Sequence, residues 1–208
     1  DNEDVIRVAS EIVAGTDDLY RAVFKISDYV ESNINYNLTS LTEKVSQKSS
    51  WVLENKFGVC DEITSLFIGL LRAVGIPARY ISGVAYTNYQ DLNDFGNHAW
   101  AEVYFPGKGF IPFDITYKEF GYVDASHVKL MESFDSLNPS TNFEWKGYNV
   151  EISAETLDIN VEVKSINLEI QSKVSANVEA IFDSVKFGSY NIIQVDVKNN
   201  HDYYIIES

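Results

Sequence analysis

Apolar side chains recur at helical spacing in three stretches of the first half of the chain. The first spans residues 5–13 and the second residues 19–34. The third is followed by Gly75 and Pro77, which end a helix; its apolar face consists of Ile63, Leu66, Phe67, Leu70, Leu71 and Val74. This repeat predicts three helices that each pack one face into a core. A shorter helix is expected within residues 46–56.

From residue 78 onward the pattern changes to that of β-strands. Segments that are rich in β-branched and aromatic side chains, or that alternate between apolar and polar ones, are residues 78–86, 99–105, 109–114, 143–150, 157–164, 174–182 and 189–198. A Pro-Gly-Lys-Gly turn joins the second and third of these segments. The order of helices and strands predicts an α+β fold with a β-rich C-terminal extension.

A polar stretch at residues 133–141, which includes Asn138-Pro139-Ser140, marks a loop between the two parts. We therefore expect a first domain over residues 1–150 and a β-rich extension over residues 151–208. The extension either completes the sheet of the first domain or begins a β-sandwich that this chain truncates. Its length is short for a whole sandwich, which typically takes ~100 residues.

Charge and composition narrow the function classes. The 208 residues carry a formal charge of −15, so no basic cluster is available to neutralise phosphates, and a nucleic-acid partner is not expected. The sequence contains no apolar run of about 18 residues and no charged-then-apolar leader, so we expect neither a membrane span nor a signal peptide. Its single cysteine excludes an internal disulfide framework and a thiolate metal cluster.

That single cysteine, Cys60, stands immediately before the third predicted helix. Unpaired backbone N–H groups and the positive end of the helix dipole favour a thiolate at such a position. An isolated cysteine is more often a small buried apolar side chain. The residues that follow in the sequence decide between these two interpretations.

Four sequence pieces follow one another in a fixed order. They are G-x-C at residues 58–60, G-I-P-A-R at 75–79, H-A-W-x-E-V at 98–103, and a short apolar strand that ends in Asp114. This pattern resembles the core of the transglutaminase-like superfamily over roughly residues 42–117. The resemblance implies a papain-like core with helices packed on an antiparallel sheet, and a triad of Cys60, His98 and Asp114. In that family Pro usually follows the aspartate, whereas Ile115 follows it here.

Other residues are candidates for supporting roles. Tyr36, Trp51 and Trp100 are candidates for an oxyanion hole or for substrate contacts, beside the backbone N–H of Cys60, and Tyr36 is equally compatible with core packing. Asp61 and Glu62 are expected to raise the pKa of the neighbouring thiol. Arg79 is expected to be a structural cation paired with an acid. His127 and His201 are expected to be ordinary surface or core histidines.

The expected activity is thiol-dependent acyl transfer on an amide bond of a peptide or protein, with hydrolysis of a peptide or isopeptide bond preferred. The polar loop at residues 87–96 offers little apolar wall to exclude water, which favours hydrolysis. Transamidation and a non-catalytic binding or structural module of a larger cell-surface protein remain alternatives, and we expect an extracellular or cell-surface location. No cofactor and no metal are expected: residues 91–96 read D-x-N-x-x-G, as in a calcium loop, but Phe95 stands at a ligand position.

Overall fold

The computed structural model describes residues 2–38, 47–87, 94–136, 148, 160–164, 174–184, 186 and 190–199. Its contacts divide the chain into two compact units, residues 1–161 together with Ser208, and residues 162–207. Within the described residues, no helix combines the length and apolar character that crossing a membrane requires.

The described residues of the first unit form four helices, where the sequence predicted them. They are α1 (Glu3–Val13), α2 (Leu19–Asn33), α3 (Ser49–Asn55) and α4 (Cys60–Ala73). The side chains of Asn2 and Asp18 cap the first two helices, because each accepts hydrogen bonds from backbone N–H groups in the first turn. The chain leaves α4 through Gly75, whose φ of +80° suits glycine.

A five-stranded antiparallel sheet follows, in the order β6-β5-β4-β3-β7. Its strands are β3 (Ala78–Thr87), β4 (Asp94–Phe105), β5 (Gly109–Asp114), β6 (Glu119–Phe120) and β7 (His127–Ser133). Both β6 and β7 are additions to the sequence prediction. The predicted loop at residues 87–96 is shorter, because β3 extends to Thr87 and β4 begins at Asp94; residues 88–93 lie outside the described part of the chain.

Two short strands bring the segment before α3 beside the segment before α4. They are β1 (Asn35–Tyr36) and β2 (Phe57–Gly58), which pair in parallel with Tyr36 opposite Gly58. Tyr36 therefore lies beside the backbone that leads into α4.

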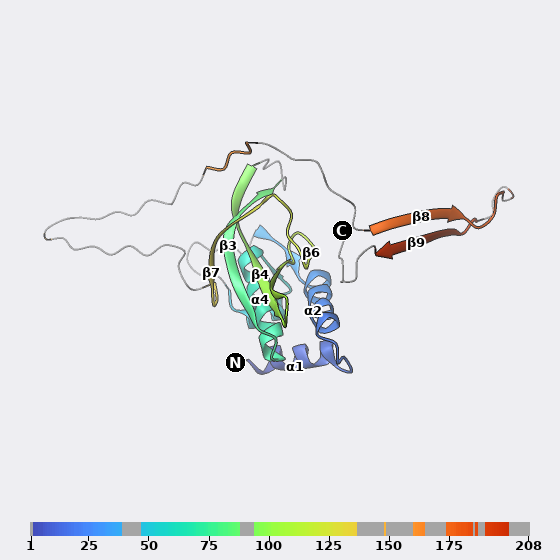
Figure 1. The fold of residues 1–208 in the computed structure, drawn as a ribbon. Helices are drawn as coiled ribbons and strands as arrows, with labels where there is room; N and C mark the ends of the chain where they lie inside the picture. The colour runs from blue at the N-terminus through green and yellow to red at the C-terminus, as the bar shows by residue number, and fades with distance from the viewer. Residues whose placement is uncertain are drawn as a thin grey trace. The chain divides into compact units, whose positions relative to one another are not determined.

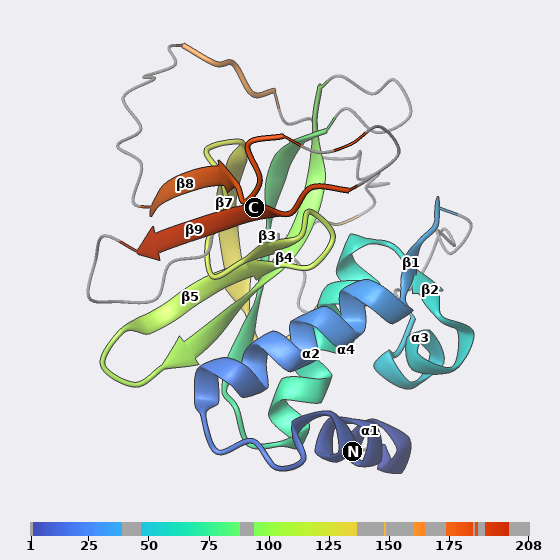
Figure 2. The ribbon, with the colours of Figure 1, turned by 90° about the vertical axis from the view of Figure 1, so that its right-hand side faces the viewer.

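The core of the first unit lies between the helices and the sheet (Figures 1 and 2). Phe113 on β5 is 1% exposed, and its ring centroid lies 5.7 Å from that of Phe24 on α2 and 6.0 Å from that of Phe67 on α4. Burying a side chain of this size contributes about 1.5–3 kcal/mol. The contacts of Phe113 fix the end of β5, where Asp114 follows. The α+β fold class predicted from the sequence is confirmed.

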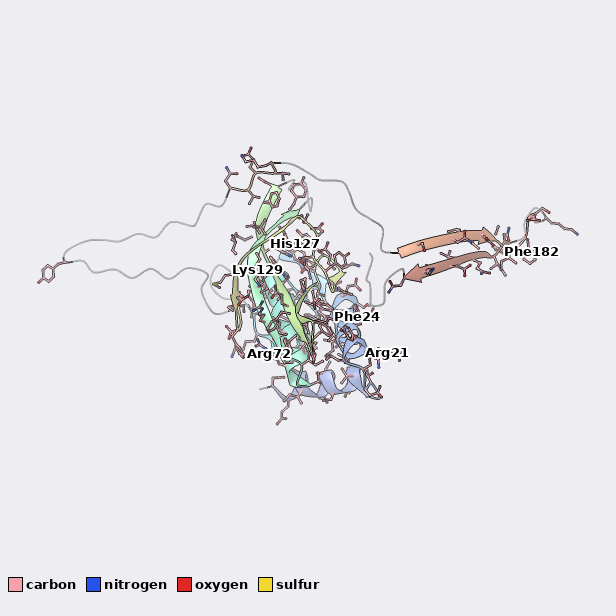
Figure 3. The ribbon with its side chains drawn as sticks, in the orientation of Figure 1. Arg21, Phe24, Arg72, His127, Lys129 and Phe182 are labelled. Atoms are coloured by element: carbon pink, nitrogen blue, oxygen red, sulfur yellow. The ribbon has the colours of Figure 1, made fainter. Side chains whose placement is uncertain are left out.

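In the described residues of the second unit, β8 (Val174–Ala180) and β9 (Ile193–Asn199) form an antiparallel pair, with Val174 opposite Asn199. β8 lies within the predicted segment 174–182, and β9 overlaps the predicted segment 189–198 and extends one residue beyond it. Residues 160–164 form no strand, contrary to the prediction for that segment, while 143–147 and 157–159 lie outside the described residues. The described apolar side chains of this unit are largely exposed, among them Phe182, labelled in Figure 3, at 50%.

Candidate active site

Cys60 is the first residue of α4, and a buried carboxylate holds the backbone that precedes it. Glu62 is 1% exposed; its Oε2 accepts a hydrogen bond from the N–H of Val59 at 3.1 Å and its Oε1 one from the N–H of Gln47 at 2.9 Å. A Cβ at position 58 would lie 3.1 Å from the Cβ of Glu62, which accounts for Gly58 in the motif. Glu62 therefore binds backbone amides and shapes the turn that leads to Cys60.

A buried hydrogen bond ties the helix of Cys60 to the strand of His98. The hydroxyl of Thr64, one helical turn after Cys60, donates to the carbonyl oxygen of Ala99 at 3.1 Å. Because Ala99 follows His98 directly, this bond sets the spacing between the cysteine and the histidine. The Cys60 side chain is close enough to His98 to contribute to the pKa of its imidazole.

His98 and Asp114 meet across the neighbouring strands β4 and β5. Nε2 of His98 lies 2.5 Å from Oδ2 of Asp114, and Asp114 is completely buried. Oδ1 of Asp114 accepts a further hydrogen bond from the N–H of Tyr117 at 3.1 Å. The Nε2 contact with Asp114 leaves Nδ1 as the ring nitrogen of His98 available to Cys60.

The electrostatics of this group favour an ionised pair. Burial opposes a charge on His98, but the hydrogen bonds to Asp114 and Cys60 outweigh it and raise the pKa of His98 to about 10. Burial likewise opposes a charge on Asp114, yet hydrogen bonds from His127 and His98 hold the pKa of its carboxyl below the ordinary value. An imidazolium beside a cysteine is the arrangement that stabilises a thiolate nucleophile.

Two aromatic rings hold the imidazole of His98 in place. The ring of Tyr117 lies 4.6 Å from it, and the ring of Trp100 stacks at 6.2 Å. The hydroxyl of Tyr117 donates to the carbonyl oxygen of Tyr86 at 3.0 Å, which ties the loop after β5 to β3. These contacts restrict the rotation of the His98 ring.

His127 is not the ordinary surface or core histidine that the sequence predicted, because it contacts the buried carboxylate of Asp114. Its side chain is 1% exposed, and its Nε2 lies 3.0 Å from Oδ2 of Asp114, the oxygen that faces His98. Figure 3 labels His127 at the start of β7, a strand that the sequence did not predict. The sequence offered only a weak signal, a second histidine 13 residues after Asp114.

The three side chains predicted to contact substrate or to form an oxyanion hole, Tyr36, Trp51 and Trp100, occupy different positions. Tyr36 and His98 line one cavity of about 480 Å³, together with Leu38, Ala85, Tyr86, Thr87, Gly96, Asn97, Thr116, Tyr117 and Glu119. Trp51 packs its ring edge-on against Phe57 at 5.1 Å and contacts the core. Trp100 is 2% exposed and packs against His98 and His127. Of the three, Tyr36 is therefore placed best to contact a substrate.

Two groups of three side chains among the described residues bring metal-type ligand atoms within 4.8 Å of one another. They are His98, Asp114 and His127, and Glu119, Asp124 and His127. In the first group the N···O separations of 2.5 and 3.0 Å are those of hydrogen bonds. Ligands bonded at about 2.1 Å to one tetrahedral ion lie roughly 3.4 Å apart. We therefore interpret these contacts as a hydrogen-bonded network.

Arg79 is a structural cation, as predicted. Its Nη2 lies 2.6 Å from Oε2 of Glu102 and its Nη1 lies 2.8 Å from Oε2 of Glu132. Glu102 would be the twelfth residue of a calcium loop that begins at position 91. Its carboxylate instead binds Arg79 and Lys129, and residues 91–93 lie outside the described part of the chain.

Comparison with known proteins identifies relatives of this chain. The model of the transglutaminase-like superfamily matches residues 6–115. Over 128 residues the chain is 30% identical to YebA, an uncharacterized protein of Bacillus subtilis, covering 55% of this chain and 17% of YebA. Over 74 residues it is 31% identical to a protein-glutamine gamma-glutamyltransferase of Pseudomonas aeruginosa, covering 33% of this chain and 11% of that enzyme.

Among solved structures, a provisionally named cysteine protease of Cytophaga hutchinsonii superposes with a TM-score of 0.53 at 28% identity, covering 64% of this chain and 43% of that one. The matched part is thus less than half the length of each of these three relatives. The family match extends over more than half of the present chain and contains Cys60, His98 and Asp114. The chain therefore belongs to the transglutaminase-like superfamily.

Proposed function

We propose that the protein is a cysteine peptidase that hydrolyses peptide or isopeptide bonds through a triad of Cys60, His98 and Asp114. One observation carries the proposal: Cys60 begins α4, Thr64 of the same helix hydrogen-bonds the residue after His98, and Nε2 of His98 lies 2.5 Å from the buried Asp114 carboxylate. This is the order of contacts that nucleophile, base and orienting acid require.

In the first half of the reaction, the thiolate of Cys60 attacks the carbonyl carbon of the scissile amide. The tetrahedral intermediate collapses when His98 gives its proton to the leaving amine, and a thioester forms at Cys60. In the second half, neutral His98 takes a proton from water, whose oxygen attacks the thioester. The second tetrahedral intermediate then collapses with cleavage of its C–S bond, which releases the carboxylic acid and leaves the Cys60 thiolate beside protonated His98.

The negative charge that develops on the carbonyl oxygen needs hydrogen-bond donors. The backbone N–H of Cys60, in the first turn of α4, is one candidate, because the first N–H groups of a helix have no partner within the helix. Tyr36 is the side-chain candidate, because it lines the same cavity as His98 and pairs with Gly58, two residues before Cys60.

The proposal takes water as the acyl acceptor because Thr87, Asn97, Thr116 and Glu119 place polar groups in the cavity beside His98, although the larger share of its exposed lining is apolar. A transferase has to keep water from the thioester and hold an amine at high effective concentration, which an apolar channel achieves. Transamidation is the second candidate. It is favoured by the 31% identity to a protein-glutamine gamma-glutamyltransferase over 74 residues.

The proposal is tested with a library of peptides and of isopeptide-linked substrates, analysed by mass spectrometry with and without millimolar primary amine. Hydrolysis predicts free acid as the main product in both samples, and its loss in Cys60→Ala. Mainly amine adduct would show a transferase. No product with any substrate, together with an unreactive Cys60 thiol, would support a non-catalytic module.

A further inference from the structure

His127 lies between two carboxylates and is almost fully enclosed. Its Nε2 lies 3.0 Å from Oδ2 of Asp114 and its Nδ1 lies 3.0 Å from Oδ1 of Asp124, while its side chain is 1% exposed. The rings of Trp100 and Tyr117 pack against it at 5.3 and 5.1 Å. The imidazole therefore has one orientation, with each ring nitrogen facing an acid.

The hydrogen-bond inventory fixes where the protons lie at Asp114. An ionised carboxylate only accepts hydrogen bonds. Oδ2 of Asp114 faces Nε2 of both His98 and His127, so each of these nitrogens carries a hydrogen. Asp114 thus receives an N–H from each histidine on one oxygen, and the backbone N–H of Tyr117 on the other.

The same inventory applies on the far side of the His127 ring. Oδ1 of Asp124 accepts the backbone N–H of Ser126 at 2.8 Å and the Ser126 hydroxyl at 2.5 Å, so it acts as an acceptor. Nδ1 of a neutral His127 would turn its lone pair toward this oxygen, because Nε2 already holds the hydrogen. The Nδ1 lone pair and the Asp124 oxygen would then repel each other. If Nδ1 also carries a hydrogen, the repulsion is replaced by a second charge-assisted hydrogen bond.

We propose that His127 is a positioning residue of the triad: a doubly protonated imidazole, anchored by Asp124, that holds the Asp114 carboxylate ionised and directed at His98. This inference rests on the proposed function, because it assigns His127 a role in supporting that triad. His127 itself touches neither Cys60 nor the substrate in this scheme, and it acts through Asp114.

The charges around His127 agree with this role. Asp114 from β5, Asp124 from the loop before β7, and Glu119 from β6, at 3.8 Å, all face it, and the His98 ring lies 5.6 Å away. Burial opposes the charged form, but the hydrogen bonds to Asp114 and Asp124 raise the pKa of His127. Burial would raise the pKa of Asp114, and His127 is the foremost hydrogen-bond donor that lowers it.

Replacing His127 removes this support while Cys60 and His98 remain. In His127→Gln, the amide can still donate one N–H to Asp114 but carries no charge. The pKa of Asp114 should then rise, so the imidazolium of His98 loses its anionic partner at a higher pH than in the wild type. Alkylation by iodoacetamide reports on Cys60 alone, because the chain has one cysteine.

The experiment measures the alkylation rate from pH 3 to pH 9, with EDTA present, in the wild type, His127→Gln and Lys129→Gln. Lys129 is the matched control, because its replacement also removes a cation from β7, and its partners are Glu102 and Glu132. The alkylation rate should fall toward acidic pH, and we call this fall the acidic limb of the profile. In His127→Gln we expect the acidic limb to lie about one pH unit higher than in the wild type, the lower end of the range of pKa shifts that an adjacent opposite charge causes. Lys129→Gln should leave it in place.

A second measurement keeps the inference testable if His127→Gln does not fold. In the wild type, ¹⁵N NMR of the three histidine rings should show both nitrogens of His127 protonated at pH 7. A neutral His127 ring, or an acidic limb that stays in place in folded His127→Gln, would overturn the inference. A wild-type thiol that is no more reactive than an unfolded one would instead refute the proposed function, and the NMR result would still decide the state of His127.

Discussion

Trp100 packs its ring directly against Gly83. A Cβ at position 83 would lie 2.7 Å from Cη2 of Trp100 and 2.2 Å from the carbonyl oxygen of Val128, and neither separation is tolerated. Gly83 pairs with His98 on β4 and lies where the register between β3 and β7 shifts. The missing side chain therefore lets β7 and the Trp100 ring approach, and together they place His98 and His127.

The variant Gly83→Ala should therefore be strongly destabilising. Its methyl group meets a backbone atom, so β7 has to move, at a cost of about 1–3 kcal/mol or more in unfolding free energy. Urea denaturation measures the loss. The control is Gly96→Ala, since a Cβ there meets nothing within 4 Å. Equal stability of the two alanine variants would show that the contact between Gly83 and β7 is not as close as described.

Variants of His98 and Asp114, the proposed base and the residue that orients it, should differ in how much activity they lose. His98→Ala removes both the base and the acid, and should lower kcat/KM by about 10²–10⁴-fold. Asp114→Asn keeps an oxygen that accepts from His98 but loses the charge, so a loss of roughly 10- to 100-fold is expected, from 1.5–3 kcal/mol for a charged hydrogen bond. Kinetics on a substrate found by library screening decide. An Asp114→Asn enzyme as active as the parent would mean that another residue orients His98.

The raised pKa of His98 also makes a prediction about stability. Its pKa of about 10 in the folded protein exceeds the ordinary value of 6.5. The folded state thus binds the proton more tightly, so this contribution to stability is complete below pH 6.5 and is lost as the pH rises through about 10. The difference in unfolding free energy between wild type and His98→Gln should shrink over that range. A difference that stays constant from pH 6.5 to 10 would contradict the assigned pKa.

The proposed division into domains, residues 1–150 and 151–208, predicts the outcome of limited proteolysis. If the two parts fold separately, a stable fragment should end between residues 133 and 156, and it should keep Cys60, His98 and Asp114. Mass spectrometry of the fragment and alkylation of its thiol check both points. Aggregation of that fragment would indicate that later strands cover an edge of the catalytic sheet.

Local sequence patterns predicted most of the first unit. The helical spacing from Ile63 to Val74 and the stop at Gly75 placed α4, and the motif order placed His98 and Asp114 on neighbouring strands. Both signals are carried by residues close together in the sequence. The paired strands then bring Asp114 to His98, because β4 and β5 are joined by a tight turn.

The part of the site that the sequence did not predict depends on long-range packing. β7 pairs with β3 at the opposite edge of the sheet from β5 and β6, and this pairing brings His127 to Asp114. The pairing requires Gly83, because a side chain there would meet the backbone of β7. Tyr117 covers His98 through a loop held by Asp114 itself. Neither His127 nor Tyr117 belongs to a periodic pattern in the sequence, so their contacts can be recognised only from the arrangement of the strands in space.

In the proposed mechanism, the fold activates the Cys60 thiol through His98. The most direct measurement is the rate of iodoacetamide alkylation at pH 7, in the folded protein, in the urea-unfolded protein and in His98→Ala. The account predicts that Cys60 reacts faster in the folded wild type than in the unfolded chain, and that His98→Ala loses this advantage. A folded wild type that reacts no faster than the unfolded chain would contradict it.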